Sequence, residues 1–262
     1  MPSSEYWISL IESEGFLFAE KIRVIRSTFP FFKESLEIIK LKLLIFNQSY
    51  SELIENEGTE LKRQMERTLT KNKQFLGAVI TIRFWLSEFK FQYSIQSTKL
   101  DHPSYELNNS GLYVSIFQNI HKSISYLSNL SVGSDLYWRI ADNHIKGATF
   151  NQFLILNTEN QIVEAIGSNI YLVKNGIIKG ASVYQGAYID ITKSLLLNIL
   201  AKLNLGYNEN DGITEQDLLE ADEIFLVNAI NGIQWVVGFE RKRYFNHTIR
   251  KINDLFVRSL VN

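Results

Sequence analysis

The residues best suited to bind an anion lie where a polar turn leads into a helical segment. Ile191 and Thr192 follow Asp190, and apolar residues recur at helical spacing from Ser194 to Leu203. The first N–H groups of a helix have no partner within it, and the helix dipole is positive at this end. The sequence therefore predicts an anion site at Ile191 and Thr192. Thr192 as a simple N-cap is the alternative, and Lys193 is expected as a solvated first-turn residue.

The sequence lacks the residues of several other common catalytic and binding sites. The chain has no cysteine, which excludes disulfides, cysteine nucleophiles and cysteinyl metal sites. Phosphate-loop, dinucleotide-loop and Gly-x-Ser-x-Gly motifs are absent from the sequence. The aromatic residues, Trp138 among them, are expected to pack cores and interfaces. The histidines have no short metal-ligand spacing, so we predict no metal site; they are His102, His121, His144 and His247.

The charge and the hydropathy of the chain limit the kinds of partner and the location that we expect. The formal net charge is -1 and the charges are dispersed, so we expect no nucleic-acid or anionic-lipid partner. The apolar runs are broken by charge well short of the ~20 residues of a membrane helix. The first residues lack the basic start and apolar core of a secretory signal. The sequence predicts a soluble, cytoplasmic protein.

Strand-like and helix-like segments alternate along the chain, and a domain boundary is expected near 122–130. The segment 152–200 reads as strand, turn, strand, turn, strand, loop and helix, with 162–173 as its second strand. The other predicted strands are 6–10, 15–26, 77–84, 90–95 and 113–116, and the other predicted helices are 33–46, 51–71 and 135–146.

Three stretches in order resemble the class IV aminotransferases: Val163–Tyr171, Ile191–Lys193 and Leu218–Leu226. This family has a pyridoxal-phosphate (PLP) fold and includes branched-chain and D-amino-acid aminotransferases and 4-amino-4-deoxychorismate lyase. The resemblance implies an α/β (α+β) protein of PLP fold type IV, similar to D-amino-acid aminotransferase. An N-terminal α/β domain (1–122) and a C-terminal α/β domain (123–262) with a mixed, barrel-like sheet would flank a pocket. It also implies a homodimer.

The resemblance implies a lysine that holds PLP as a Schiff base, and two registers are open for it. In the first, Leu127–Ser134 matches the family pattern and Ser131 stands at the lysine position, 33 residues before Glu164. In the second, His121–Leu127 matches and Lys122 is the Schiff-base lysine, which requires about nine extra residues before the Glu164 strand. Glu164 would contact the pyridine nitrogen, or would be an exposed glutamate at a hairpin.

The phosphate end of the family's site is altered. The resemblance places Ile38 at the position of the phosphate-binding arginine, Ala229 at that of a Ser or Thr, and Lys193 at that of an arginine. An apolar side chain cannot pair with a phosphate dianion. Charge-assisted hydrogen bonds contribute roughly 1.5–3 kcal/mol each, so losing two such groups could cost ~3–4 kcal/mol, about two to three decades of affinity. We therefore expect no tight PLP binding.

Three functions follow from these registers. The first is a homologue of class IV aminotransferases or aminodeoxychorismate lyase that lacks Schiff-base PLP chemistry, a pseudoenzyme that binds a small anionic or aromatic ligand or serves as a partner subunit. The second is an active PLP-dependent aminotransferase or lyase that uses Lys122, with Glu164, Ile191 and Thr192 holding the ring and phosphate. The third is a structural protein that uses only its dimer surface.

Overall fold

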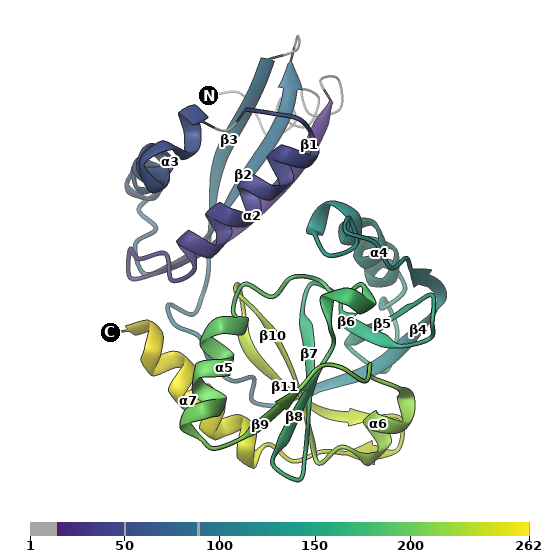
Figure 1. The fold of residues 1–262 in the computed structure, drawn as a ribbon. Helices are drawn as coiled ribbons and strands as arrows, with labels where there is room; N and C mark the ends of the chain where they lie inside the picture. Colours follow the sequence, from purple (N-terminus) through teal and green to yellow (C-terminus); the bar gives the residue numbers. More distant parts are fainter. Residues whose placement is uncertain (1–14, 50, 88–89, 262) are drawn as a thin grey trace. The chain divides into compact units, whose positions relative to one another are not determined.

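The computed structural model describes residues 15–49, 51–87 and 90–261 (Figure 1). The chain divides into two compact units, Met1–Ser104 and Tyr105–Asn262. The division falls before the predicted boundary at 122, so the strand β4 (Leu112–Lys122) lies in the second unit, whereas the sequence prediction placed it in the first. The strand predicted at 6–10 lies outside the described residues.

The first unit is a three-stranded antiparallel sheet with two helices. The sheet order is β1 (Phe16–Ile25), β2 (Gly77–Ser87) and β3 (Lys90–Lys99). Helix α2 (Phe32–Ile45) packs on β1, and α3 (Ser51–Asn72) packs on β3, as the apolar periodicity predicts. The long helix predicted at 51–71 is interrupted at 55–58, where Gly58 has a φ of 71°. A Cβ on Gly58 would come within 2.9 Å of Leu36, so glycine allows both the turn and the close approach of α2.

The second unit is built on a nine-stranded mixed sheet, which confirms the predicted mixed α/β class. Its order is β6-β5-β4-β11-β10-β7-β8-β9, and β12 pairs with β11. The pairs β4–β5, β4–β11 and β8–β9 are parallel and the others are antiparallel. The further strands are β5 (Gln152–Asn157), β6 (Ile162–Ala165), β7 (Asn169–Lys174), β8 (Ile177–Gly180), β9 (Gly206–Asn208), β10 (Glu223–Asn228), β11 (Gly232–Phe239) and β12 (Lys242–Arg243).

Helices cover this sheet. Helix α4 (Ser131–Asn143) packs on β4 and β5, while α5 (Lys193–Lys202) and α7 (His247–Val261) lie side by side (Figure 1). The short α6 (Glu215–Glu220) packs on β7, and a single 3-10 turn, η1 (Val183–Gln185), follows β8. Among the described residues, no helix is long and apolar enough to cross a membrane.

The run 162–173 forms two strands, not the single strand predicted. A turn at 166–168 separates β6 from β7, and Gly167 adopts a φ of 65° there. The Ala165 N–H donates to the Ser168 carbonyl across the turn, and the Asn228 amide holds the Ser168 hydroxyl at 2.7 Å. β-branched residues on both sides of the break favour extended backbone, so periodicity alone does not reveal the turn, although Gly167 and Ser168 are residue types typical of turns. The break leaves Glu164 on β6, beside β5.

Candidate active site

Lys122 is the last residue of β4 and is completely buried. Strand β4 runs parallel to β5, but the register shifts between Phe117 and Lys122, where β4 carries extra residues opposite β5. Such a bulge turns side chains that regular alternation would place on the other face. The lysine amine is consequently enclosed within the second unit.

The partner of Lys122 is Glu164, which is also completely buried. Lys122 Nζ donates to Glu164 Oε2 at 2.5 Å, and the Tyr188 backbone N–H donates to the same oxygen at 2.8 Å. The other oxygen, Oε1, accepts the indole N–H of Trp138 at 2.7 Å. Three donors from β4, α4 and the segment before α5 thus converge on one carboxylate. Glu164 is therefore not the exposed hairpin glutamate that the sequence left open.

Burial changes the acid–base properties of this pair. It lowers the pKa of the Lys122 amine, while the adjacent Glu164 carboxylate raises it. It raises the pKa of the Glu164 carboxyl, while Lys122, Trp138 and the Tyr188 N–H lower it. Both shifts reduce the cost of moving the proton from the amine to the carboxylate. Lys122 can therefore be a neutral, nucleophilic amine at a lower pH than an exposed lysine.

The segments around the pair are fastened to one another. The Trp138 ring meets Tyr188 edge-on, with ring centroids 5.1 Å apart. The side-chain amide of Asn129 donates to the carbonyls of Val183 and Ala187 at 2.8 and 2.7 Å, and the Asn129 carbonyl accepts the N–H of Ile189. The loop after Lys122 and the loop that carries Tyr188 thus hold each other in place.

Ser131 is the first residue of α4 and is not among the three donors to Glu164. The register with Lys122 needs extra residues before the Glu164 strand. Loops at 123–130 and 144–151 on either side of α4 provide room for them, so no insertion inside the helix is required. The structure therefore accommodates the extra residues of this register in loops.

The predicted anion site at the start of α5 is occupied by a side chain of the protein. Asp190 Oδ1 accepts both the Thr192 N–H at 2.8 Å and the Thr192 hydroxyl at 2.6 Å. Asp190 Oδ2 accepts the Tyr171 hydroxyl at 2.6 Å. Thr192 is the N-cap residue of α5, as the alternative predicted, but its hydroxyl donates to Asp190 and forms no side-chain cap with the helix. Ile191 beside it is partly buried.

The other predicted phosphate contacts lie elsewhere. Lys193 begins α5 and pairs with Glu209, so it is not simply solvated. Ala229 follows β10, and its carbonyl accepts the Tyr105 hydroxyl at 2.5 Å. Ile38 is a buried residue of α2 in the first unit. None of these three side chains offers an unpaired cationic or hydroxyl group for a phosphate.

Sequence reasoning missed Trp138, Tyr188 and Asp190. Trp138 had no signal beyond its place in a predicted helix, and Tyr188 acts through its backbone. Asp190 had one: an Asp two residues before Thr192 is a pattern in which the side chain accepts the later N–H.

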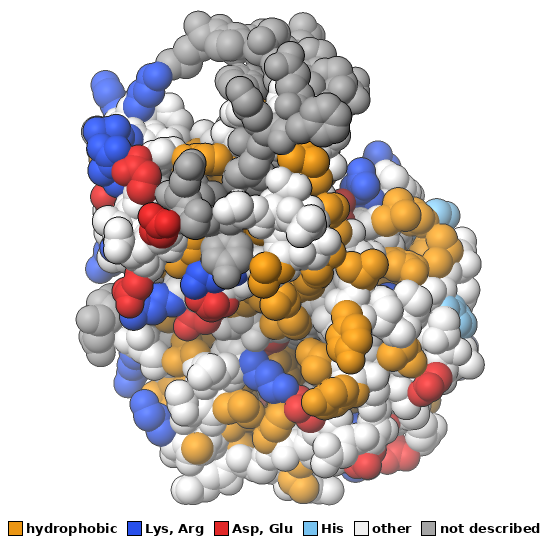
Figure 2. Space-filling model, turned by 45° about the horizontal axis from the view of Figure 1, so that its top comes forward, with side chains coloured by type: hydrophobic (Ala, Val, Ile, Leu, Met, Phe, Trp, Pro, Cys, Tyr) orange, Lys and Arg blue, Asp and Glu red, His pale blue; other side chains and the backbone are white. Residues whose placement is uncertain are grey.

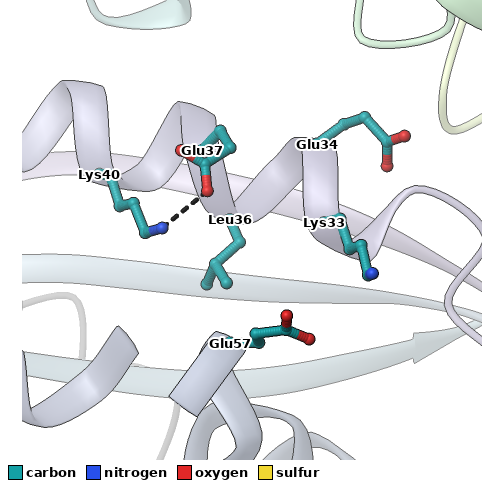
Figure 3. A pocket seen from close by; sticks show the side chains of 6 residues that line it. All are labelled: Lys33, Glu34, Leu36, Glu37, Lys40 and Glu57. Carbon is teal, nitrogen blue, oxygen red and sulfur yellow. Dashed lines mark hydrogen bonds and ion pairs between the residues drawn. The ribbon is translucent and has the colours of Figure 1, made fainter. Parts of the chain in front are cut away.

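The first unit has a hollow on its surface that is lined mainly by charged side chains. It encloses about 250 Å³ between α2 and the interrupted part of α3 (Figure 3). Two lysines and three glutamates line it, of which Lys40 and Glu37 pair at 2.7 Å, and it carries no functional proposal. Within the described ranges no cluster of three or more His, Cys, Asp or Glu could hold a metal ion. The lining residues are Lys33, Glu34, Leu36, Glu37, Lys40 and Glu57.

Known proteins of similar fold and sequence share this framework. A crystal structure of branched-chain amino acid aminotransferase from Escherichia coli matches with a TM-score of 0.81 at 14% identity, over 96% of this chain and 86% of that one. The enzyme from Thermoproteus uzoniensis with norvaline gives 0.81 at 19%, over 96% and 88%. A structure from Legionella pneumophila, provisionally described as a 4-amino-4-deoxychorismate lyase, gives 0.80 at 19%, over 95% and 92%. These likenesses confirm PLP fold type IV, a mixed α/β fold with a curled half-barrel sheet.

Sequence comparison covers less of the chain. A protein of Methanocaldococcus jannaschii, provisionally described as a branched-chain-amino-acid aminotransferase, is 29% identical over 45% of this chain and 38% of its own length. A similarly described protein of Aquifex aeolicus is 24% identical over 44% and 40%. The matched segments thus span less than half of either relative. The profile of the amino-transferase class IV family matches residues 45–238, and the chain belongs to that family.

Proposed function

We propose that the second unit carries out covalent carbonyl chemistry through the amine of Lys122, as an aminotransferase or lyase of the class IV type. The observation that carries this proposal is the buried contact of Lys122 Nζ with Glu164 Oε2 at 2.5 Å. Burial lowers the pKa of the Lys122 amine, and Glu164 can accept its proton. The neutral Nζ can bond to a carbonyl carbon while the carbonyl oxygen leaves as water with the two amine hydrogens.

Only one end of the site fits the family's cofactor. PLP, when bound, supplies an electron sink for carbanion chemistry. Lys122 offers the amine, and Glu164 would offer a carboxylate for a pyridine nitrogen once its contact with Lys122 opens. The phosphate end does not fit, because both Thr192 donors already serve Asp190. Ile38 and Ala229 are apolar and supply no replacement for the missing phosphate contacts.

The competing hypothesis is that Ser131 replaces the lysine and that Schiff-base chemistry is lost. It requires Lys122 to be a structural residue only. The sequence favours Ser131 at the lysine position, because the Lys122 register needs about nine extra residues before Glu164. The buried contact with Glu164 favours Lys122 as the Schiff-base lysine.

Reductive trapping separates the two hypotheses. The protein is incubated with PLP or pyridoxal, reduced with borohydride and analysed by peptide mass spectrometry. We expect an adduct on Lys122 that persists in Ser131→Ala and disappears in Lys122→Ala or, where that variant does not fold, in Lys122→Arg. Lys42 is a second fully buried, carboxylate-paired lysine and serves as an internal comparison. A folded protein without a Lys122 adduct from either aldehyde would establish the competing hypothesis.

A homodimer is the assembly that we propose. Hydrophobic side chains gather in patches on the face shown in Figure 2. Around the loop that follows Lys122, Tyr126 is 92% exposed, and Tyr184 of η1 is 89% exposed. Gly186, beside η1, lies against Ile124 of the same loop, so these aromatic residues belong to neighbouring segments. A second copy of the chain would cover them at low cost.

A further inference from the structure

The segment that leads into α5 takes part in the Lys122 site. The Tyr188 N–H binds Glu164, and Asp190 follows two residues later. Two extended residues span at most about 7 Å, so a ligand joined to Lys122 lies within a few ångströms of the segment that enters α5. What occupies this helix end therefore affects which ligand the lysine can accept.

Asp190 is anchored there from two elements. Its Oδ1 takes the Thr192 N–H and hydroxyl, which are the donors an incoming anion would use. Its Oδ2 takes the hydroxyl of Tyr171, a buried residue of β7 whose ring stacks on Phe225 at 5.3 Å. Thr192 itself is completely buried. The carboxylate consequently occupies the position that a ligand phosphate would need.

The surrounding charge acts in the same direction. Lys193, the cation at the start of α5, is paired with Glu209, and Glu209 also accepts the Tyr207 hydroxyl at 2.7 Å. Asp190 and Glu209 together outnumber this one cation. A phosphate dianion would therefore meet net negative charge as well as donors that are already engaged.

We infer that Asp190 is a specificity-determining residue whose carboxylate closes the α5 end to phosphate, so that the Lys122 site takes carbonyl compounds without a phosphate group in preference to phosphorylated ones. The preference at Lys122 rests on the proposed function. The closure of the helix end does not depend on it.

The test compares two aldehydes that differ only in the phosphate. Pyridoxal and pyridoxal phosphate are trapped by borohydride on the full chain, and the concentration that gives half-maximal labelling of Lys122 is measured for each. We expect pyridoxal to label at the lower concentration. Asp190→Asn removes the charge but keeps one oxygen acceptor for Thr192, and should shift the ratio toward the phosphorylated aldehyde by about tenfold, the equivalent of one charge-assisted hydrogen bond. Asp142→Asn, an exposed change on α4, should leave the ratio unchanged.

Inorganic phosphate provides a readout that does not involve Lys122. Millimolar phosphate should raise the melting temperature of Asp190→Asn more than that of the original protein. A variant with unchanged aldehyde ratio and unchanged phosphate response would overturn the inference. So would binding of phosphate to the original protein with protection of the Thr192 N–H, a measurement that stands even where the variant does not fold. Absence of labelling by both aldehydes alongside the expected phosphate response would refute the proposed function while supporting the closure of the helix end.

Discussion

Lys122 Nζ and Glu164 Oε2 lie 2.5 Å apart, and neither side chain has any exposure to solvent. The two residues come from β4 and β6, which are separated in the sheet by β5. Removing one member of a buried ion pair costs about 3–5 kcal/mol because the other charge stays buried, whereas replacing both can be neutral. The pair is thus a strong constraint on this end of the sheet, whatever its chemistry.

Replacing Lys122 alone should accordingly destabilise the protein more than replacing both partners. We expect Lys122→Met to lower the free energy of unfolding by about 3–5 kcal/mol, and the double change Lys122→Met with Glu164→Gln to recover most of it. Urea unfolding of the two single variants, the double variant and the original protein gives the coupling energy. Additive single changes would show that the contact contributes no specific stability.

The pH dependence of the same variants tests the buried state of Glu164. In Lys122→Met, burial still holds the Glu164 pKa above the ordinary value of a glutamate carboxyl, and the lowering by Lys122 is gone. A carboxyl whose folded pKa is raised contributes stability below its unfolded pKa that is lost as pH rises through the folded pKa. The unfolding free energy of Lys122→Met, less that of the double variant, should therefore fall as pH rises above about 4.5. A flat difference between pH 4 and 8 would contradict this.

Trp138 should act mainly by holding Glu164. Trp138→Phe retains an aromatic ring against Tyr188 but removes the N–H that donates to Oε1 at 2.7 Å. A hydrogen bond to a charged group contributes about 1.5–3 kcal/mol, so the loss of stability should lie in that range. Trp235→Phe is the matched control, because the Trp235 indole donates to the neutral carbonyl of Asn108. This change should lower the free energy of unfolding by only about 0.5–1.5 kcal/mol. Equal losses in the two variants would indicate that ring volume dominates.

Local pattern predicted most of the helices and strands, and long-range contacts decided the site. The α2 helix and the β2 and β3 strands lie close to their predicted positions because helical apolar spacing and β-branched or aromatic runs mark them locally. The sequence predicts Lys122 and Glu164 as candidate site residues but not their contact with each other. That contact depends on a register shift in β4 and on the packing of β6 beside β5. The closed end of α5 depends equally on Tyr171 from a separate strand.

The proposed homodimer makes a prediction for the exposed aromatic residues near Lys122. Tyr126→Ser with Tyr184→Ser should shift the protein toward monomer, because both side chains are almost fully exposed in the single chain. Phe245→Ser is the control, since Phe245 is also exposed, at 73%, but precedes α7. Light scattering across a dilution series measures the effect. A monomeric original protein, or equal weakening by the control, would exclude this surface as the dimer contact.

The first unit contains its own buried ion pair. It tests whether a buried lysine–glutamate pair can stabilise the protein without affecting the carbonyl labelling of Lys122. Lys42 Nζ on α2 donates to Glu20 on β1; Lys42 has no exposure and Glu20 only 6%. Lys42→Met should therefore destabilise this unit by about 3–5 kcal/mol, because it leaves the Glu20 carboxylate buried without its cation. Lys40→Met on the same helix breaks only the partly exposed pair with Glu37 and should change stability by less than about 1 kcal/mol. Calorimetry of both variants measures the contrast, and carbonyl labelling of Lys122 should continue in whatever fraction of Lys42→Met stays folded. Loss of labelling at full folding would show instead that the Glu20–Lys42 pair contributes to the site in the second unit.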